Sequence, residues 1–160
     1  YFSSLMLKLL EIPKDILVFE KYPILNQIWG IVSTEYAKDA TLEWQTTEDS
    51  GSIYFILLDD EVIGITGYWV IDDTYAGLRW HGIIPTYRKQ GLSTVSLKLL
   101  FACIPKNISV IYEIANNDKT ARYFESIGFN RVTDETLRTY VCTSSGEGNI
   151  GENIVLNYFI

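Results

Sequence analysis

The chain has 160 residues, of which 48% are hydrophobic and 21% are charged. This length suits one domain with a sizeable core, and the composition excludes a disordered chain. The formal net charge is −7 and Lys and Arg do not cluster, which argues against a general nucleic-acid grip. An acidic chain favours cationic partners such as amines, although acidity can equally serve only to keep a chain in solution.

No apolar stretch reaches the ~20 residues of a membrane span. Residues 1–5 precede Met6 and look like an addition to a native start, so we expect a single domain over residues 6–160. No secretory leader pattern is visible, which favours a cytoplasmic protein. Cys103 and Cys142 form no CxxC pair beside the one histidine, so no zinc site is expected.

The first half of the chain predicts a strand, helices and then a meander. Residues 6–12 alternate weakly, as in a short strand, and residues 13–36 have helical spacing interrupted near Pro23 and Gly30. A polar loop follows over 37–52. Apolar runs at 53–58, 62–71 and 75–84 are separated by the short acidic turns 59–61 and 72–73. Such short connections predict antiparallel strands.

The hydrophobic period becomes helical after Pro85. The spacing of Leu92, Val95, Leu99 and Cys103 predicts a helix over 93–102. Cys103, at the end of its apolar face, is expected to be a small core residue. Residues 108–114 are apolar and predict a further strand.

A second helix is predicted from an N-cap at Asn117-Asp118 to a left-handed stop at Gly128. Residues 132–143 and 152–160 are expected to be two closing strands joined by a Gly- and Ser-rich turn. The order of elements predicts an α/β (α+β) fold: a mixed, mostly antiparallel central sheet of about seven strands, flanked by helices.

The informative turn lies between the third meander strand and the next helix. It spans residues 88–93, with the sequence Arg-Lys-Gln-Gly-Leu-Ser. Gly91 lets the backbone approach a ligand, and the N–H groups of residues 90–93 with the helix dipole suit phosphate oxygens. Arg88 and Lys89 add positive charge. Taken alone, such a turn is more often a plain helix start with two solvated basic residues.

In this context the chain resembles the GCN5-related N-acetyltransferase superfamily. The superfamily signature R/Q-x-x-G-x-G/A is matched by Arg88 and Gly91, with Ser93 in place of the final small residue. A later segment, an Asn followed by a helix that ends in Gly-Phe, is matched by Asn117 and residues 124–129. The resemblance covers residues 53–132 well, and the order of elements extends it to the whole chain.

The resemblance implies that acetyl-CoA is the co-substrate and that its acetyl group passes to a primary amine by direct attack in a ternary complex. It further implies that the backbone of 90–93 holds the pyrophosphate and that the strand ending at Ile83 and Ile84 binds the pantetheine. This strand would splay from 108–114 and leave a gap for the thioester. The cofactor-binding residues implied are Ile83, Ile84, Arg88, Lys89, Gln90, Gly91, Leu92, Ser93, Asn117 and Phe124.

Amine acetylation needs a base. Glu113, near the end of the strand 108–114, is the preferred candidate, and its alternative is a surface charge at a strand end. His81 is the weaker candidate, because a lone histidine on a strand is more often structural. Neither cysteine is placed to carry an acyl group, which favours direct attack.

Phe124 stands where many superfamily members have a tyrosine that protonates the leaving thiolate, and phenylalanine cannot do so. This departure motivates an alternative function, a non-catalytic acyl-CoA-binding sensor or assembly module of the same fold. If the chain is an enzyme, the acceptor is a small-molecule or protein amine. The sequence leaves the oligomeric state open. A homodimer is a common arrangement in the superfamily, and the apolar segment 154–160 could pair between subunits.

Overall fold

The computed structural model describes residues 6–13, 23–24, 51–144, 151 and 153–160, apart from the side chain of Trp80. The helical segment predicted over 13–36 and the loop predicted over 37–52 lie largely outside these residues. The chain forms two compact units. Unit 1 comprises Tyr1–Gly67 and Trp80–Cys103, and unit 2 comprises Tyr68–Arg79 and Ile104–Ile160. The single domain expected over 6–160 stays a prediction.

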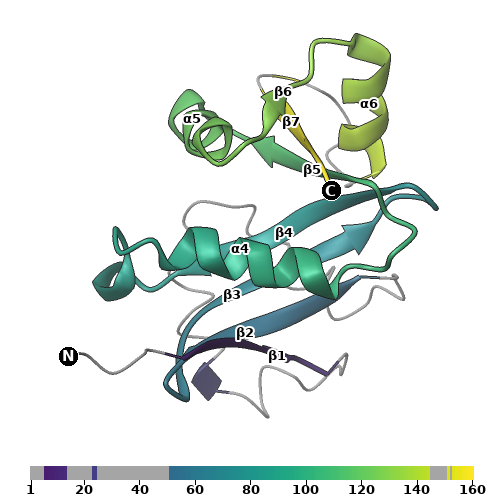
Figure 1. Cartoon of the computed structure of the whole chain (residues 1–160). Helices are drawn as coiled ribbons and strands as arrows, with labels where there is room; N and C mark the ends of the chain where they lie inside the picture. The colour runs from purple at the N-terminus through teal and green to yellow at the C-terminus, as the bar shows by residue number, and fades with distance from the viewer. Residues whose placement is uncertain (1–5, 14–22, 25–50, 145–150, 152) are drawn as a thin grey trace. The chain divides into compact units, whose positions relative to one another are not determined.

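The strands predicted in the first half of the chain are confirmed (Figure 1). β1 (Leu7–Glu11) pairs antiparallel with β2 (Ser52–Leu58). β3 (Glu61–Val70) follows after Asp59 and Asp60, whose φ angles are 49° and 71°. Two positive φ angles in a two-residue loop suit the right-handed twist of a hairpin. β4 (Tyr75–Ile83) completes the meander.

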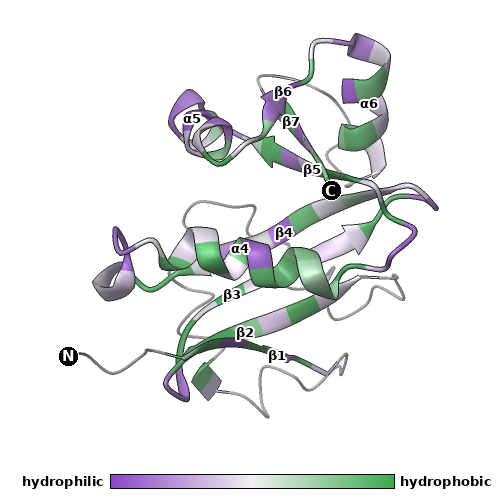
Figure 2. Cartoon of the chain, in the orientation of Figure 1, coloured by the Kyte–Doolittle hydropathy of each residue, from purple (hydrophilic) through white to green (hydrophobic). Residues whose placement is uncertain are grey.

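The core of unit 1 is built from apolar strand residues and the first turn of a helix. Ile56, Leu58, Ile63 and Ile83 are buried together, with Leu92 packed against them. Every residue from 53 to 58 is buried, so β2 is covered on both faces, and the apolar runs are green in Figure 2.

After the 3-10 turn η1 (Pro85–Tyr87), helix α4 (Leu92–Cys103) confirms the predicted helix. The predicted apolar stripe is wrong: Val95 is 46% exposed and Cys103 is exposed. The buried side chains of α4 are Ser96, Leu97 and Leu100. The prediction was wrong because it treated Ser96 as an exposed polar residue. The Ser96 hydroxyl in fact donates to the Leu92 carbonyl of the same helix, which allows this side chain to be buried.

Unit 2 contains both parallel and antiparallel ladders. β5 (Val110–Ala115) runs parallel to the start of β4, from the pair Tyr75–Val110 to the pair Gly77–Tyr112. It is antiparallel to β7 (Ile154–Phe159), which also pairs with the short β6 (Asn130–Arg131). The strand order β1-β2-β3-β4-β5-β7-β6 gives the mixed, mostly antiparallel sheet of seven strands that was predicted.

The strand predicted over 132–143 is wrong, because residues Glu135–Ser144 form helix α6. Asp134 accepts a hydrogen bond from the Leu137 N–H at 2.9 Å, as an N-cap does. Leu137 and Val141, four residues apart, pack into the unit 2 core. The β-branched composition favoured a strand, but the cap and the helical spacing prevail.

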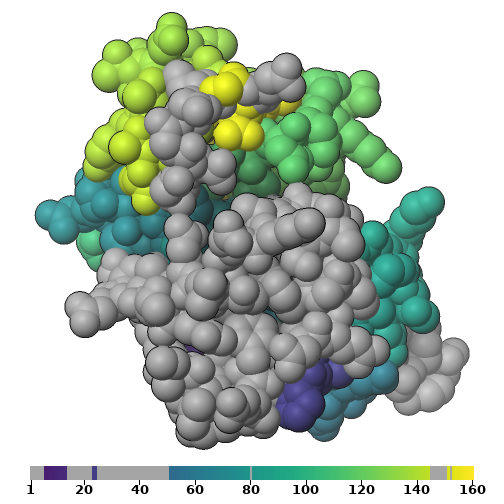
Figure 3. Space-filling model, turned by 180° about the vertical axis from the view of Figure 1, so that it is seen from behind, coloured from purple at the N-terminus to yellow at the C-terminus, as the bar shows by residue number. Residues whose placement is uncertain are grey.

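Helix α6 is also fastened to the β3–β4 turn. The Tyr140 hydroxyl donates to the Asp72 carboxylate at 2.6 Å, and the same carboxylate accepts the N–H groups of Thr74 and Tyr75. Seen from behind, α6 and the end of β7 lie on the surface of unit 2 (Figure 3). Among the helices that the structure describes, none has the length and apolar character of a membrane span.

The cap of α6 gives a direct test of the corrected helix. We expect Asp134→Ala to lower the free energy of unfolding by about 1 kcal/mol, because the Leu137 N–H loses its acceptor. Asp134→Asn keeps a capping oxygen and serves as the matched control. Urea denaturation followed by circular dichroism measures both variants, and equal losses in the two would contradict the cap.

Candidate functional site

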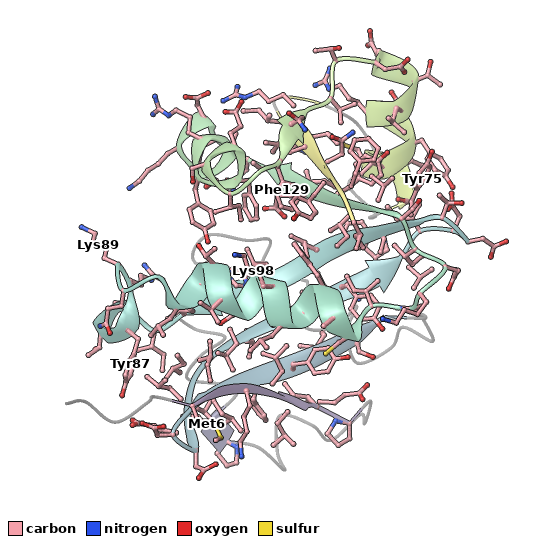
Figure 4. The ribbon with its side chains drawn as sticks, in the orientation of Figure 1. Met6, Tyr75, Tyr87, Lys89, Lys98 and Phe129 are labelled. Carbon is pink, nitrogen blue, oxygen red and sulfur yellow. The ribbon has the colours of Figure 1, made fainter. Side chains whose placement is uncertain are left out.

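The backbone of the turn before α4 alternates in handedness. Lys89 has a φ of 64° and Gly91 a φ of 76°, while Gln90 between them has a negative φ. Alternation of this kind directs successive N–H groups into one concavity, which suits an anion. A Cβ built on Gly91 would meet no atom within 4 Å, so the space beside it is open. Lys89 is exposed and points away from the turn (Figure 4).

Hydrogen bonds hold the turn and the residues before it in place within unit 1. The Arg88 Nε donates to the Ile83 carbonyl at 2.8 Å, and the Gln90 amide donates to the Thr86 carbonyl at 3.3 Å. The Ile84 N–H donates to the Ile63 carbonyl at 2.8 Å. Arg88 therefore shapes the turn as well as carrying charge. The pantetheine contacts predicted for Ile83 and Ile84 stay a prediction, and a carbonyl with one partner can still accept a second bond.

The N-terminus of α4 lies directly after this turn. The first hydrogen bond of the helix between residues four apart runs from the Val95 N–H to the Gly91 carbonyl at 3.3 Å. Leu92 and Ser93 therefore lie in the first turn, where backbone N–H groups have no acceptor within the helix. The first turn of α4 contains no acidic residue. The helix dipole therefore meets no carboxylate of its own first turn, and the end is suited to an anion.

His81 is held from both sides of its ring within unit 1. Its Nδ1 lies 3.0 Å from the Thr66 Oγ1 and its Nε2 lies 2.7 Å from the Ser93 Oγ. Burial lowers the pKa of His81 to about 4, so the imidazole is neutral at neutral pH. Thr66, which is completely buried, is the contact that sequence reasoning missed. No local pattern signals it, because the two residues lie on different strands.

Glu113 is buried on β5 in unit 2, opposite Leu156 of β7. It is only 6% exposed, so the alternative of a strand-end surface charge does not fit. Desolvation raises the pKa of its carboxyl to about 8, against a smaller lowering by the Ile114 N–H. A buried carboxyl whose pKa lies near the working pH is a candidate acid or base. Whether Glu113 is the base stays a prediction.

Asn117 and Phe124 belong to helix α5 (Asp118–Ser126) of unit 2 and its cap. The Asn117 Oδ1 accepts the Thr120 N–H at 2.8 Å, which confirms the predicted N-cap. Phe124 is buried, and its ring lies 5.1 Å from that of Phe129 in an edge-on packing. Gly128, with a φ of 112°, follows the end of the helix as predicted. The cofactor contacts predicted for Asn117 and Phe124 stay predictions.

The comparisons with known proteins agree with this fold. The model of the acetyltransferase (GNAT) family matches residues 19–129. The chain is similar to Tetrahymena GCN5, with 16% identity, 96% of each chain covered and a TM-score of 0.71. An acetyltransferase from Thermus thermophilus is similar at 16% identity, 97% of each chain and a TM-score of 0.70. No curated protein matches the sequence.

A GNAT family acetyltransferase from Elizabethkingia anophelis, solved with acetyl-CoA bound, is similar at 13% identity, 98% of each chain and a TM-score of 0.66. At these identities the structures establish the fold. The family model covers more than half of the chain, and the chain therefore belongs to the GNAT acetyltransferase family.

The buried carboxyl of Glu113 predicts a stability effect that depends on pH. Its pKa rises from 4.5 to about 8 on folding, so between these values the folded chain holds a proton that the unfolded chain releases. The free energy of unfolding therefore falls as pH rises across this window. Glu113→Gln lacks this titrating group. As pH rises across the window, the free energy of unfolding of the variant should therefore increase relative to that of the parent, by up to about 1.4 kcal/mol per pH unit.

Urea denaturation at pH 5, 6, 7 and 8 measures the difference in free energy of unfolding between Glu113→Gln and the parent. The contributions of the other titrating groups are common to both chains and drop out of this difference. Glu135→Gln, at an exposed position on α6, is the matched control for the loss of a carboxylate. A constant difference between Glu113→Gln and the parent would show that Glu113 titrates normally in the folded chain.

Proposed function

We propose that the chain is an N-acetyltransferase that transfers the acetyl group of acetyl-CoA to a primary amine by direct attack in a ternary complex. The observation that carries this proposal is the turn 88–91 with the N-terminus of α4. Its backbone alternates in handedness, the space beside Gly91 is open and no acidic residue occupies the first helical turn. The acetyl-CoA bound to the Elizabethkingia anophelis protein supports the choice of ligand.

The chemistry requires a neutral amine. The nitrogen lone pair attacks the thioester carbonyl carbon, the C–S bond breaks and coenzyme A leaves as the thiolate. The nitrogen, which is positively charged after the attack, gives up one proton as the amide forms, and this proton passes through water to the thiolate. The ammonium proton must first pass to a base, for which we propose the ionised carboxylate of Glu113. A carboxylate whose pKa is about 8 holds a proton more strongly than an exposed one, so it is better matched to an amine.

Gly91 tests the cofactor site. We expect Gly91→Ala to weaken coenzyme A binding at least about tenfold, because a methyl group would enter the open space and the left-handed φ of 76° disfavours a side chain. Isothermal titration calorimetry measures the dissociation constant. Gly151→Ala, at a φ of 49°, also puts a side chain on left-handed backbone but lies in unit 2, outside this turn of unit 1, and should bind normally. Equal binding by Gly91→Ala and the parent would remove the turn from the site.

Glu113 tests the base. We expect Glu113→Gln to lower kcat/KM by about 10²–10⁴. In the parent, kcat/KM should rise with pH and level off above an inflection near pH 8, because only the ionised carboxylate accepts the proton. Thiol release from acetyl-CoA measures the rates, with Glu135→Gln as the control. A parent profile that is unchanged in Glu113→Gln would assign the inflection to another group.

Phe124 favours a second candidate, a non-catalytic acyl-CoA sensor or assembly module. Its ring is buried against Tyr123 and Phe129 and offers no proton to a leaving thiolate. Turnover against a panel of amines separates the two functions: a sensor binds coenzyme A without releasing thiol for any acceptor. The acceptor class, a small-molecule or protein amine, the homodimer and a cytoplasmic location stay predictions.

A further inference from the structure

Three side chains form a hydrogen-bonded line from β3 through β4 to α4: Thr66, His81 and Ser93. All three belong to unit 1. We propose that His81 is a positioning residue for the cofactor, holding the Ser93 hydroxyl so that it donates a hydrogen bond to the pyrophosphate of coenzyme A. This inference rests on the function proposed for the turn and adds a side-chain donor to its backbone donors.

The place of Ser93 in the helix supports this role. Ser93 is the second residue of α4. Helical side chains lean toward the N-terminus, so a side chain at this position starts close to the donor end of the helix. A hydroxyl at this place adds a donor that the glycine or alanine of the superfamily signature lacks.

The neutral imidazole gives the line a direction. A neutral ring has one N–H and one acceptor nitrogen, so protons are donated either from Thr66 through His81 to Ser93 or the opposite way. In the first direction the Nε2–H donates to the Ser93 oxygen, and the hydroxyl proton points away from the ring. An anion at the start of α4 favours this direction, because it attracts that proton.

A serine oxygen 2.7 Å from a histidine nitrogen is also the geometry of a nucleophile and its base. Two features argue against that role. The third member is a threonine hydroxyl, which cannot stabilise an imidazolium as a carboxylate does. Burial also favours the neutral ring, so it accepts a proton poorly. The line is therefore suited to holding a hydroxyl in place, not to activating it.

The test compares coenzyme A with pantetheine, which lacks the phosphates, in calorimetric binding to the full chain. The weaker ligand is measured by displacement. We expect Ser93→Ala and His81→Phe each to raise the dissociation constant of coenzyme A about tenfold, the loss of one hydrogen bond to a charged group. The double variant should lose no more than either single one, because both remove the same contact. Pantetheine binding should change by less than about twofold.

Two conservative variants separate positioning from simple packing. The amide of glutamine reaches the place of the histidine Nε2, whereas that of asparagine reaches only the place of Nδ1. We therefore expect His81→Gln to keep coenzyme A binding closer to the parent than His81→Asn does. Ser96→Ala is the matched control on the same helix, since its buried hydroxyl donates to the Leu92 carbonyl at 2.7 Å and takes no part in the line. Thermal unfolding confirms that each variant is folded.

Coenzyme A binding that is unchanged in both His81→Phe and His81→Asn would overturn the inference and leave the proposed function standing. So would losses that multiply in the double variant, or a parallel loss of pantetheine binding, which would indicate general damage to the fold. A parent chain that binds no coenzyme A would overturn the proposed function itself. Thioester hydrolysis that needs both Ser93 and His81 would assign the pair to nucleophilic catalysis instead.

Discussion

The N-terminus of α4 can bind an anion only if the chain that leads into the helix leaves its free N–H groups accessible. The turn after β4 achieves this with a short 3-10 segment and two left-handed residues, Lys89 and Gly91. A left-handed lysine costs about 1 kcal/mol or more, and such strain persists only when the surroundings determine it. Here the Arg88 side chain bonds to the Ile83 carbonyl and fixes the turn to the strand that precedes it. The shape of the candidate site therefore rests on this bond as well as on Gly91.

Burial acts in opposite directions on the pKa of two groups, one in each unit. It lowers the pKa of His81 to about 4 and raises that of Glu113 to about 8, so both side chains are largely uncharged at neutral pH. The two differ in what else they contact. His81 bonds to two hydroxyls, which suits a fixed ring. Glu113 can ionise close to physiological pH, which suits a group that exchanges protons.

Local patterns predicted the strands, the turn and the α5 cap, because each depends on neighbours in sequence. They failed for α6, where the many β-branched residues predicted a strand. The signal for a helix was a single capping residue, Asp134. They also failed for the partners of His81, because Thr66 lies 15 residues away and Ser93 lies 12. A contact between different elements leaves no periodic trace. The signature motif located the turn, but the contact of its last residue, Ser93, with His81 became visible only in the structure.

Acetyl transfer to an amine involves two proton problems: protonating the leaving thiolate and deprotonating the acceptor ammonium. The missing hydroxyl at Phe124 affects only the first, which is the smaller of the two. A thiol has a pKa near 8.5, so coenzyme A leaves as a thiolate without much need for an acid. An alkyl amine has a pKa near 10.4, so at pH 7 only about one molecule in 10³ is neutral. Removing that proton is the harder step, and it is the step for which we propose the buried carboxylate of Glu113, whose pKa is raised to about 8. An aromatic cluster of Phe124 and Phe129 is then compatible with the proposed enzyme, for which we assign the base to Glu113.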